Sequence, residues 1–260
     1  MSPNNIPSQS ATAIRPLGLV GSLLLFGVPA LGFSWSVLSV LPSLARQGYS
    51  NYTIFVVTFL GPLAVLFLTA LAAYRIEGRP WTWASFAERM RLAGMNRQQW
   101  LWTIGLVVGS FALQILIAPL ARALQGIPLI SWPPEFGQFM ASMEQGSVGL
   151  DLRGRWDVLA VVSIGLALFN VGGEELWWRG IILPRQELAL GNYAWVVNGV
   201  LWAAFHAFYH STLAGFLSYV PGTTLLAYVY WKRKSTWPGI IAHTIQNSGV
   251  PIMLFKGITS

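Results

Sequence analysis

The polar groups inside apolar runs that are candidates for chemistry fall in the last third of the chain. They are Glu174, Glu175, Arg179, His206, His210, His243 and Asn247. A carboxylate and a neutral imidazole beside one water can share the role of general base. A second imidazole and an amide can donate hydrogen bonds to a developing oxyanion. This set of residue types therefore suits the attack of water on an amide carbonyl.

Helical spacing sorts these groups into faces. Glu175 and Arg179 are four residues apart, so they share a face and can neutralise each other. Glu174 lies about 100° around the same helix and points elsewhere. His243 and Asn247 are also four residues apart and are expected to project together from the last apolar run.

The depth of each group in its helix can be compared using the helical rise of about 1.5 Å per residue. Counted from the nearer membrane face, Glu174 lies about 15 Å in, His206 about 16 Å and His243 about 13 Å. His210, one turn beyond His206, falls deeper. Three helices are therefore expected to bring one acid and two imidazoles to a single layer, with His210 outside it.

The composition indicates the solvent in which these groups must work. The chain is 54% hydrophobic and 10% charged, with a mean hydropathy of +0.55, whereas soluble domains carry about 25% charged residues. A multi-pass membrane protein is expected, and the 13 tryptophans suit membrane interfaces. The net charge is +7, and the basic residues lie between apolar runs, so membrane topology explains them better than nucleic-acid binding. The absence of cysteine excludes disulfides and thiolate chemistry.

Seven apolar runs of about 17–25 residues predict an all-α, polytopic membrane helix bundle. Their approximate limits are 17–41, 54–74, 100–121, 157–183, 195–212, 213–231 and 238–255. Only a short polar stretch separates the fifth run from the sixth, so six or eight spans stay open. Residues 1–16 are polar and contain proline, which predicts a disordered tail ahead of one transmembrane domain, 17–260.

The positive charges predict the orientation of the bundle. Eleven of the 16 Lys and Arg residues fall on the side of the N-terminus and five on the other side, so the N-terminus is expected in the cytoplasm. We assume the inner membrane of a bacterium. The loop 75–99 is either an amphipathic helix on the inner leaflet or a solvated basic loop. The segment 122–156 is a long outer loop with room for one short helix.

Three short motifs follow one another on the last helices. "EELWWR" (174–179) fits E-E-x-x-x-R, "WAAFH" (202–206) lies where F-x-x-x-H would fall, and "HTIQN" (243–247) fits H-x-x-x-N. In this order they resemble the CPBP family, which comprises the type II CAAX prenyl endopeptidases and their prokaryotic relatives, also called Abi proteins. The resemblance covers about residues 160–255. It departs from the family at Trp202, where phenylalanine is usual.

The resemblance implies an intramembrane endopeptidase whose site opens near the cytoplasmic side. Glu174 and His206 would activate the attacking water, and His243 and Asn247 would form the oxyanion hole. The supporting residues would be Glu175, Arg179 and Trp202, of which the first two hold the motif helix together. The expected partners are a peptide or membrane-anchored protein substrate and the lipid bilayer.

Metal use and two other functions stay open from the sequence. We favour a water activated without a metal cofactor, although Glu174, His206 and His243 could form an open three-ligand zinc site. One alternative function is a non-catalytic membrane scaffold or bacteriocin-immunity protein on the same fold. The other is a proton-coupled transporter, in which buried carboxylates and imidazoles also occur.

Overall fold

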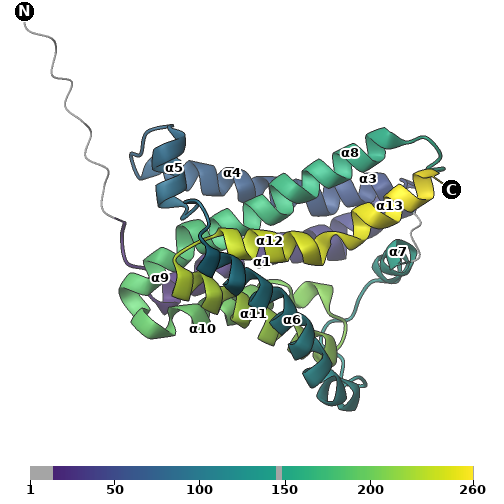
Figure 1. Ribbon diagram of the computed structural model, residues 1–260. Helices are drawn as coiled ribbons and strands as arrows, with labels where there is room; N and C mark the ends of the chain where they lie inside the picture. The colour runs from purple at the N-terminus through teal and green to yellow at the C-terminus, as the bar shows by residue number, and fades with distance from the viewer. Residues whose placement is uncertain (1–13, 145–147, 260) are drawn as a thin grey trace, which may run out of the picture.

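The computed structural model describes residues 14–144 and 148–259 (Figure 1). Within these ranges the chain is helical and contains no β-strand, apart from an isolated bridge between Pro128 and Thr212. The predicted all-α helix bundle is therefore confirmed. The predicted tail falls mainly on residues 1–13, which lie outside the described residues.

The α-helices of the described residues vary from single short turns to long rods. They are α1 (Leu19–Trp35), α2 (Leu41–Arg46), α3 (Asn51–Phe55), α4 (Gly61–Ile76), α5 (Trp83–Arg89), α6 (Arg97–Ala123), α7 (Pro134–Glu144), α8 (Trp156–Gly165), α9 (Leu183–Leu190), α10 (Ala194–Phe205), α11 (Leu213–Arg233), α12 (Trp237–Asn247) and α13 (Gly249–Thr259). Short π-helical segments join several of them. Those that matter for the site are η3 (Leu166–Gly172) and η4 (Glu175–Ile182), which connect α8 to α9.

Among the described residues, four continuous helical stretches are long and apolar enough to cross a membrane. They are Leu19–Arg46, Asn51–Ile76, Arg97–Ala123 and Trp156–Phe205. The fourth has two legs, because the chain turns at Gly191, which adopts a φ of +55°, and α10 packs back against α9. A positive φ favours glycine at this turn.

The later spans differ from the predicted limits. The fifth and sixth are confirmed as separate helices, but α10 ends at Phe205 rather than continuing to 212. After a single 3₁₀ turn, Ala207–Tyr209, the chain pairs its backbone with residues 127–129, since Leu129 N–H donates to Ser211 O and Leu213 N–H donates to Ile127 O. Irregular backbone at membrane depth is tolerated where protein satisfies it in this way. The predicted last span, 238–255, is two helices, α12 and α13.

The segments predicted on the side of the N-terminus lie together at one end of the bundle. Figure 1 shows α5 and α9 at one end and α7 and the C-terminus at the other. At the α5 end, Glu77 accepts hydrogen bonds of 2.6 Å from Arg89 Nε and 2.8 Å from Arg185 Nη2. Glu187 accepts two from Arg91, at 2.7 and 2.8 Å, and lies 2.7 Å from Lys234 Nζ. The short helices expected within 75–99 and 122–156 are α5 and α7.

Glu77 lies just beyond the end of α4, and its ionisation is shifted by this cluster. Burial alone would raise the pKa of its carboxyl. The hydrogen bonds and charges of Arg89 and Arg185 outweigh burial and hold the pKa below its ordinary value of 4.5. The loop 75–99 is thereby fastened to α9 as an ion-paired structure.

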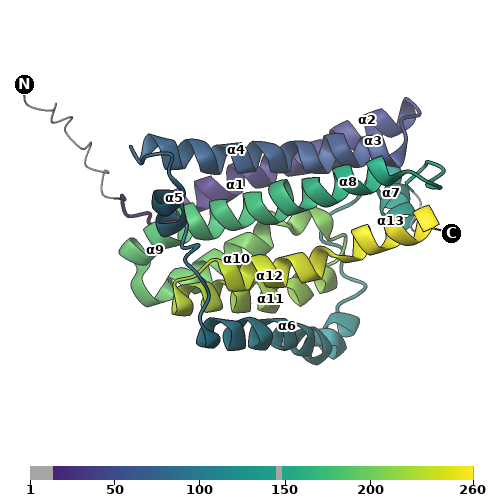
Figure 2. The same cartoon turned by 45° about the horizontal axis from the view of Figure 1, so that its top comes forward.

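The helix formed by α8, η3, η4 and α9 runs through the middle of the bundle. Figure 2 shows it between α4 on one side and α12 on the other, with α6 outside α11 and α12. The close approach of α4 depends on Gly173, because a Cβ built there would lie 3.1 Å from the Leu63 carbonyl oxygen. A small residue at this position therefore lets the two helices pack closely.

Candidate active site

The two adjacent glutamates lie where one π-helical segment gives way to the next. Glu174 follows η3 and Gly173, and Glu175 is the first residue of η4. Both side chains are buried, with 1% and 0% of their surface exposed. π-Helical turns often mark functional positions because they re-aim side chains out of the regular helical register.

Glu174 is held by two neutral N–H donors from two helices. Asn170 Nδ2 donates to Oε1 at 2.9 Å, and Trp202 Nε1 donates to Oε2 at 2.6 Å. Asn170 lies four residues before Glu174 on the same helix, whereas Trp202 comes from α10. Both oxygens of the carboxylate are therefore fixed in direction.

His206 lies just after α10 and faces the same carboxylate. Its Nδ1 is 2.9 Å from the carbonyl oxygen of Trp202. A carbonyl can only accept, so Nδ1 carries a proton, and a neutral ring then has its lone pair on Nε2. Nε2 lies 3.7 Å from Glu174 Oε2. Two acceptors face each other across this gap, and 15% of the His206 side chain is exposed.

Glu175 points away from Glu174 and binds the last motif. His243 Nδ1 lies 2.7 Å from Glu175 Oε1, and the Tyr230 hydroxyl donates to Oε2. Gly239 makes room for this tyrosine, because a Cβ there would lie 2.1 Å from the Tyr230 ring. Glu175 therefore positions His243, a contact that the sequence did not predict.

Arg179 faces Glu175 as its spacing predicted, although loosely. Its Nη1 lies 3.8 Å from Glu175 Oε2, and both side chains are fully buried. Among the described residues, the three guanidinium nitrogens have no hydrogen-bond partner. The guanidinium carbon instead lies 3.8 Å from the centre of the Trp202 ring. A cation over an aromatic face is stabilised by the ring quadrupole.

Asn247 reaches the motif helix one turn beyond His243. Its Nδ2 donates to Asn170 Oδ1. The Nδ2 of Asn170 in turn donates to Glu174 Oε1. A hydrogen-bonded chain thus links the last motif to the first glutamate. The motif search missed Asn170, although an amide in an apolar run four residues from Glu174 was a usable signal.

His210 lies outside this network, as expected from its depth. Its ring centre is 5.4 Å from that of Tyr219, and within the described chain its Nε2 is buried without a hydrogen-bond partner. Tyr219 also lies beside His206, with ring centres 5.0 Å apart. No sequence signal distinguishes Tyr219 or Tyr230, because each belongs to an ordinary aromatic pattern on α11.

The helices that carry this network match a known protein family. Residues 156–249 match the family model of the type II CAAX prenyl endopeptidase Rce1-like proteins. The chain carries an Rce1-like domain. The matched range contains all three motifs and every residue of the hydrogen-bonded network described above. No curated protein and no solved structure matches the chain significantly.

The acidic and imidazole side chains of the Rce1-like domain do not form a metal centre in this arrangement. Among residues 14–144 and 148–259, no group of three or more His, Asp or Glu side chains is gathered to hold a metal ion. Glu175 engages His243 Nδ1. Because these side chains are not gathered into a three-ligand set among the described residues, we derive no step through a metal.

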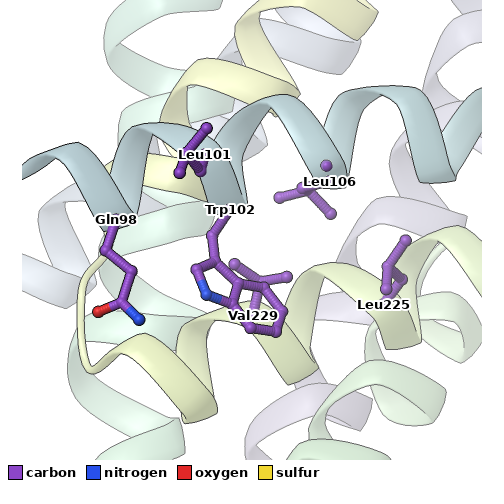
Figure 3. Close-up of a pocket in the computed structure, with 7 residues that line it drawn as sticks. Gln98, Leu101, Trp102, Leu106, Leu225 and Val229 are labelled. Carbon is purple, nitrogen blue, oxygen red and sulfur yellow. The ribbon is translucent and has the colours of Figure 1, made fainter.

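An apolar cavity of about 460 Å³ lies outside the Rce1-like domain's polar network, between α6 and α11. Figure 3 shows Trp102 and Leu106 of α6 facing Val229 and Leu225 of α11, with Gln98 at one end. The residues that line it include none of the predicted site residues. We therefore assign the chemistry to the polar network.

Proposed function

We propose that the protein is an intramembrane endopeptidase that hydrolyses a peptide bond with a water activated by Glu174 and His206. The observation that carries the proposal is the gap of 3.7 Å between Glu174 Oε2 and His206 Nε2. Both atoms are acceptors. A water about 2.8 Å from each can donate one O–H to each atom, and its lone pairs then face the open side of the gap.

Glu174 takes the proton as the water attacks the scissile carbonyl. Its two oxygens are held by neutral N–H donors, which leaves a lone pair of Oε2 to accept that proton. His206 Nε2 accepts the second O–H of the water. This hydrogen bond orients the water toward the scissile carbonyl while its other proton passes to Glu174. The same proton then passes to the leaving amine, because a group that has acted as base is poised to act as acid.

His243 and Asn247 stabilise the oxyanion that forms on the carbonyl oxygen. The His243 ring donates from Nδ1 to Glu175, so donation from Nε2 to an oxyanion requires a ring that carries both protons. The Glu175 carboxylate, 2.7 Å from Nδ1, would balance the charge of that ring. Asn247 Nδ2 has two N–H groups, of which one is engaged by Asn170 and the other is free for the substrate.

The site is proposed to open toward the cytoplasm. The ion-paired end, which holds α5 and α9, carries the excess of Lys and Arg that marks the cytoplasmic side. The N-terminus would accordingly lie in the cytoplasm. The substrate is a peptide or membrane-anchored protein that presents an extended segment to the gap between Glu174 and His206.

The test uses full-length protein in proteoliposomes and a fluorogenic peptide with a prenylated Cys-aliphatic-aliphatic-X end. Glu174→Ala and His206→Ala are expected to reduce kcat/KM by about 10²–10⁴-fold, the size of a lost general base. His210→Ala is the matched control, because it removes an imidazole one turn away and outside the network. It should leave cleavage near the wild-type rate.

A second arm covers substrates that are not prenylated. The peptides in membranes that contain the wild-type protein are compared with those in membranes that contain Glu174→Ala at equal abundance. We expect peptides that depend on Glu174. Cleavage of the probe that persists in Glu174→Ala, or the same peptides in both membranes with no probe cleavage, would overturn the proposal.

A further inference from the structure

We propose that Asn170 and Trp202 form a two-sided N–H clamp that positions Glu174 for the reaction. The inference rests on the proposed function for its catalytic consequence and on geometry for the clamp itself. Asn170 belongs to none of the three motifs, and Trp202 replaces the usual phenylalanine of the second. Each is a positioning residue, since each acts through Glu174.

The clamp engages one carboxylate oxygen from each side. Asn170 donates to Oε1 at 2.9 Å and Trp202 to Oε2 at 2.6 Å. A carboxylate offers about four lone-pair sites, so two donors leave acceptor capacity on both oxygens. Oε2, which faces His206, keeps a lone pair for water. The two donors also prevent rotation of the carboxylate plane.

The choice of neutral donors matters for the chemistry. An arginine bound directly to Glu174 would hold it as a stable anion, as Arg89 holds Glu77. Neutral N–H donors fix the carboxylate without a full opposing charge, so it can still accept a proton. The nearby cation, Arg179, is kept off Glu174 and rests on the Trp202 ring at 3.8 Å.

Arg179 gives the indole donor its strength. Its guanidinium nitrogens have no hydrogen-bond partner among the described residues, so the buried charge acts mainly on the ring face and on Glu175. A cation over the indole draws electron density from it and polarises its N–H. A polarised N–H makes a stronger hydrogen bond to a carboxylate. Phenylalanine at position 202 could accept the cation but could not pass the effect to Glu174.

Asn170 connects the clamp to the oxyanion side. Its Oδ1 accepts from Asn247 while its Nδ2 donates to Glu174, so one amide bridges the two ends of the reaction site. Its position is set by the helix, because residues four apart share a face. The spacing of the general base and the oxyanion donor is thereby fixed by one side chain.

The first experiment removes the indole N–H. Trp202→Phe is compared with Trp178→Phe, because Trp178 is equally buried and its Nε1 has no hydrogen-bond partner within the described residues. With the prenylated peptide probe, Trp202→Phe should lower kcat about 10–100-fold and leave KM within about twofold. Trp178→Phe should change neither by more than about threefold. Equal kcat losses in the two variants would overturn the role of the indole donor.

The second experiment separates donation from packing at position 170. Asn170→Leu removes both hydrogen bonds at similar size, and Asn170→Asp keeps the shape but sets a second carboxylate against Glu174. The clamp predicts a loss of kcat of about tenfold for leucine and a larger loss for aspartate. A structural role would give the reverse order, because aspartate is the closer match in shape.

The third experiment does not depend on activity. The melting temperature in detergent is measured for Trp202→Phe and Trp178→Phe, each with Glu174 and with Glu174→Ala. Trp202→Phe should lower the melting temperature by less in the Glu174→Ala background, because the acceptor of the indole N–H is already gone. Trp178→Phe should lower it equally in both backgrounds. Equal costs of Trp202→Phe in both backgrounds would overturn the clamp, whereas cleavage that survives Glu174→Ala would overturn only the proposed function.

Discussion

Two sets of carboxylates in this bundle are treated in opposite ways. At the α5 end, Glu77 and Glu187 each receive two or more charged donors at 2.6–2.8 Å. Inside the bundle, Glu174 receives two neutral N–H donors, and the nearest arginine stacks on a tryptophan instead. The first arrangement fastens a loop and the second leaves a carboxylate able to take a proton.

The difference follows from what a charged partner does to a carboxylate. A bidentate arginine stabilises the anion and makes it a poor base. An amide or an indole directs the oxygens without supplying a full charge. We expect substitutions in the first set to act mainly on stability and those in the second mainly on turnover.

The largest expected effect is on turnover at Glu174. Glu174→Gln keeps the shape and one of the two N–H contacts but removes the base, so kcat/KM should fall about 10³-fold. The melting temperature in detergent should change by only a few degrees. Retention of a tenth or more of wild-type cleavage of the peptide probe would remove the distinction between the two sets.

The next effect is on stability at Glu77. Glu77→Ala leaves Arg89 buried without its partner, which costs about 3 kcal/mol. Unfolding in a denaturant series should show that loss, and the folded fraction should keep near wild-type kcat. Glu88→Ala, on the same loop in α5, serves as a control. A full loss of kcat in folded Glu77→Ala would mean that the ion-paired end takes part in the reaction.

A smaller effect is expected at Gly239, which links packing to the site. A methyl group there meets the Tyr230 ring, so Gly239→Ala should displace Tyr230 from Glu175 and loosen His243. We expect kcat to fall about 10–100-fold, and overpacking of the buried ring to lower the stability by about 1–3 kcal/mol. Gly222→Ala is the control, because a Cβ there meets nothing within 4 Å. Equal rates for the two variants would show that Tyr230 does not support His243.

The smallest expected effect is a dependence of stability on acid. The pKa of Glu77 in the folded protein lies below its ordinary value of 4.5. Its contribution is therefore complete above that ordinary value and is lost as the pH falls through the lower folded pKa. Melting temperatures between pH 7 and pH 3 should drop more for the wild type than for Glu77→Gln. Parallel curves for the two proteins would contradict the ion-pair account.

The sequence predicted the parts of the fold that depend on apolar length and on motif spacing. Composition indicated a helical membrane bundle, and depth arithmetic brought Glu174 and His206 to the same layer, where the structure places them 3.7 Å apart. The catalytic roles of these residues stay predictions. Helical spacing also anticipated the contact between Glu175 and Arg179.

What the sequence could not predict depends on tertiary contacts. The end of α10 at Phe205 follows from backbone pairing with residues 127–129, which no local pattern reveals. The Tyr230 hydroxyl binds the same carboxylate as His243, and it fits only because Gly239 of α12 leaves space for the tyrosine ring of α11. The spacing of Asn170 from Glu174 was visible in the sequence. Its role as a hydrogen-bond donor became evident only from the contact with the Glu174 carboxylate.

The most direct test of the account is a double-mutant comparison of kcat/KM with the prenylated peptide probe in proteoliposomes. Glu174→Gln, His206→Ala and the double variant are measured beside the wild type. If the two groups activate one water together, the double variant will be about as slow as the slower single variant. Losses that multiply in the double variant, or undiminished cleavage in either single variant, would contradict the shared water.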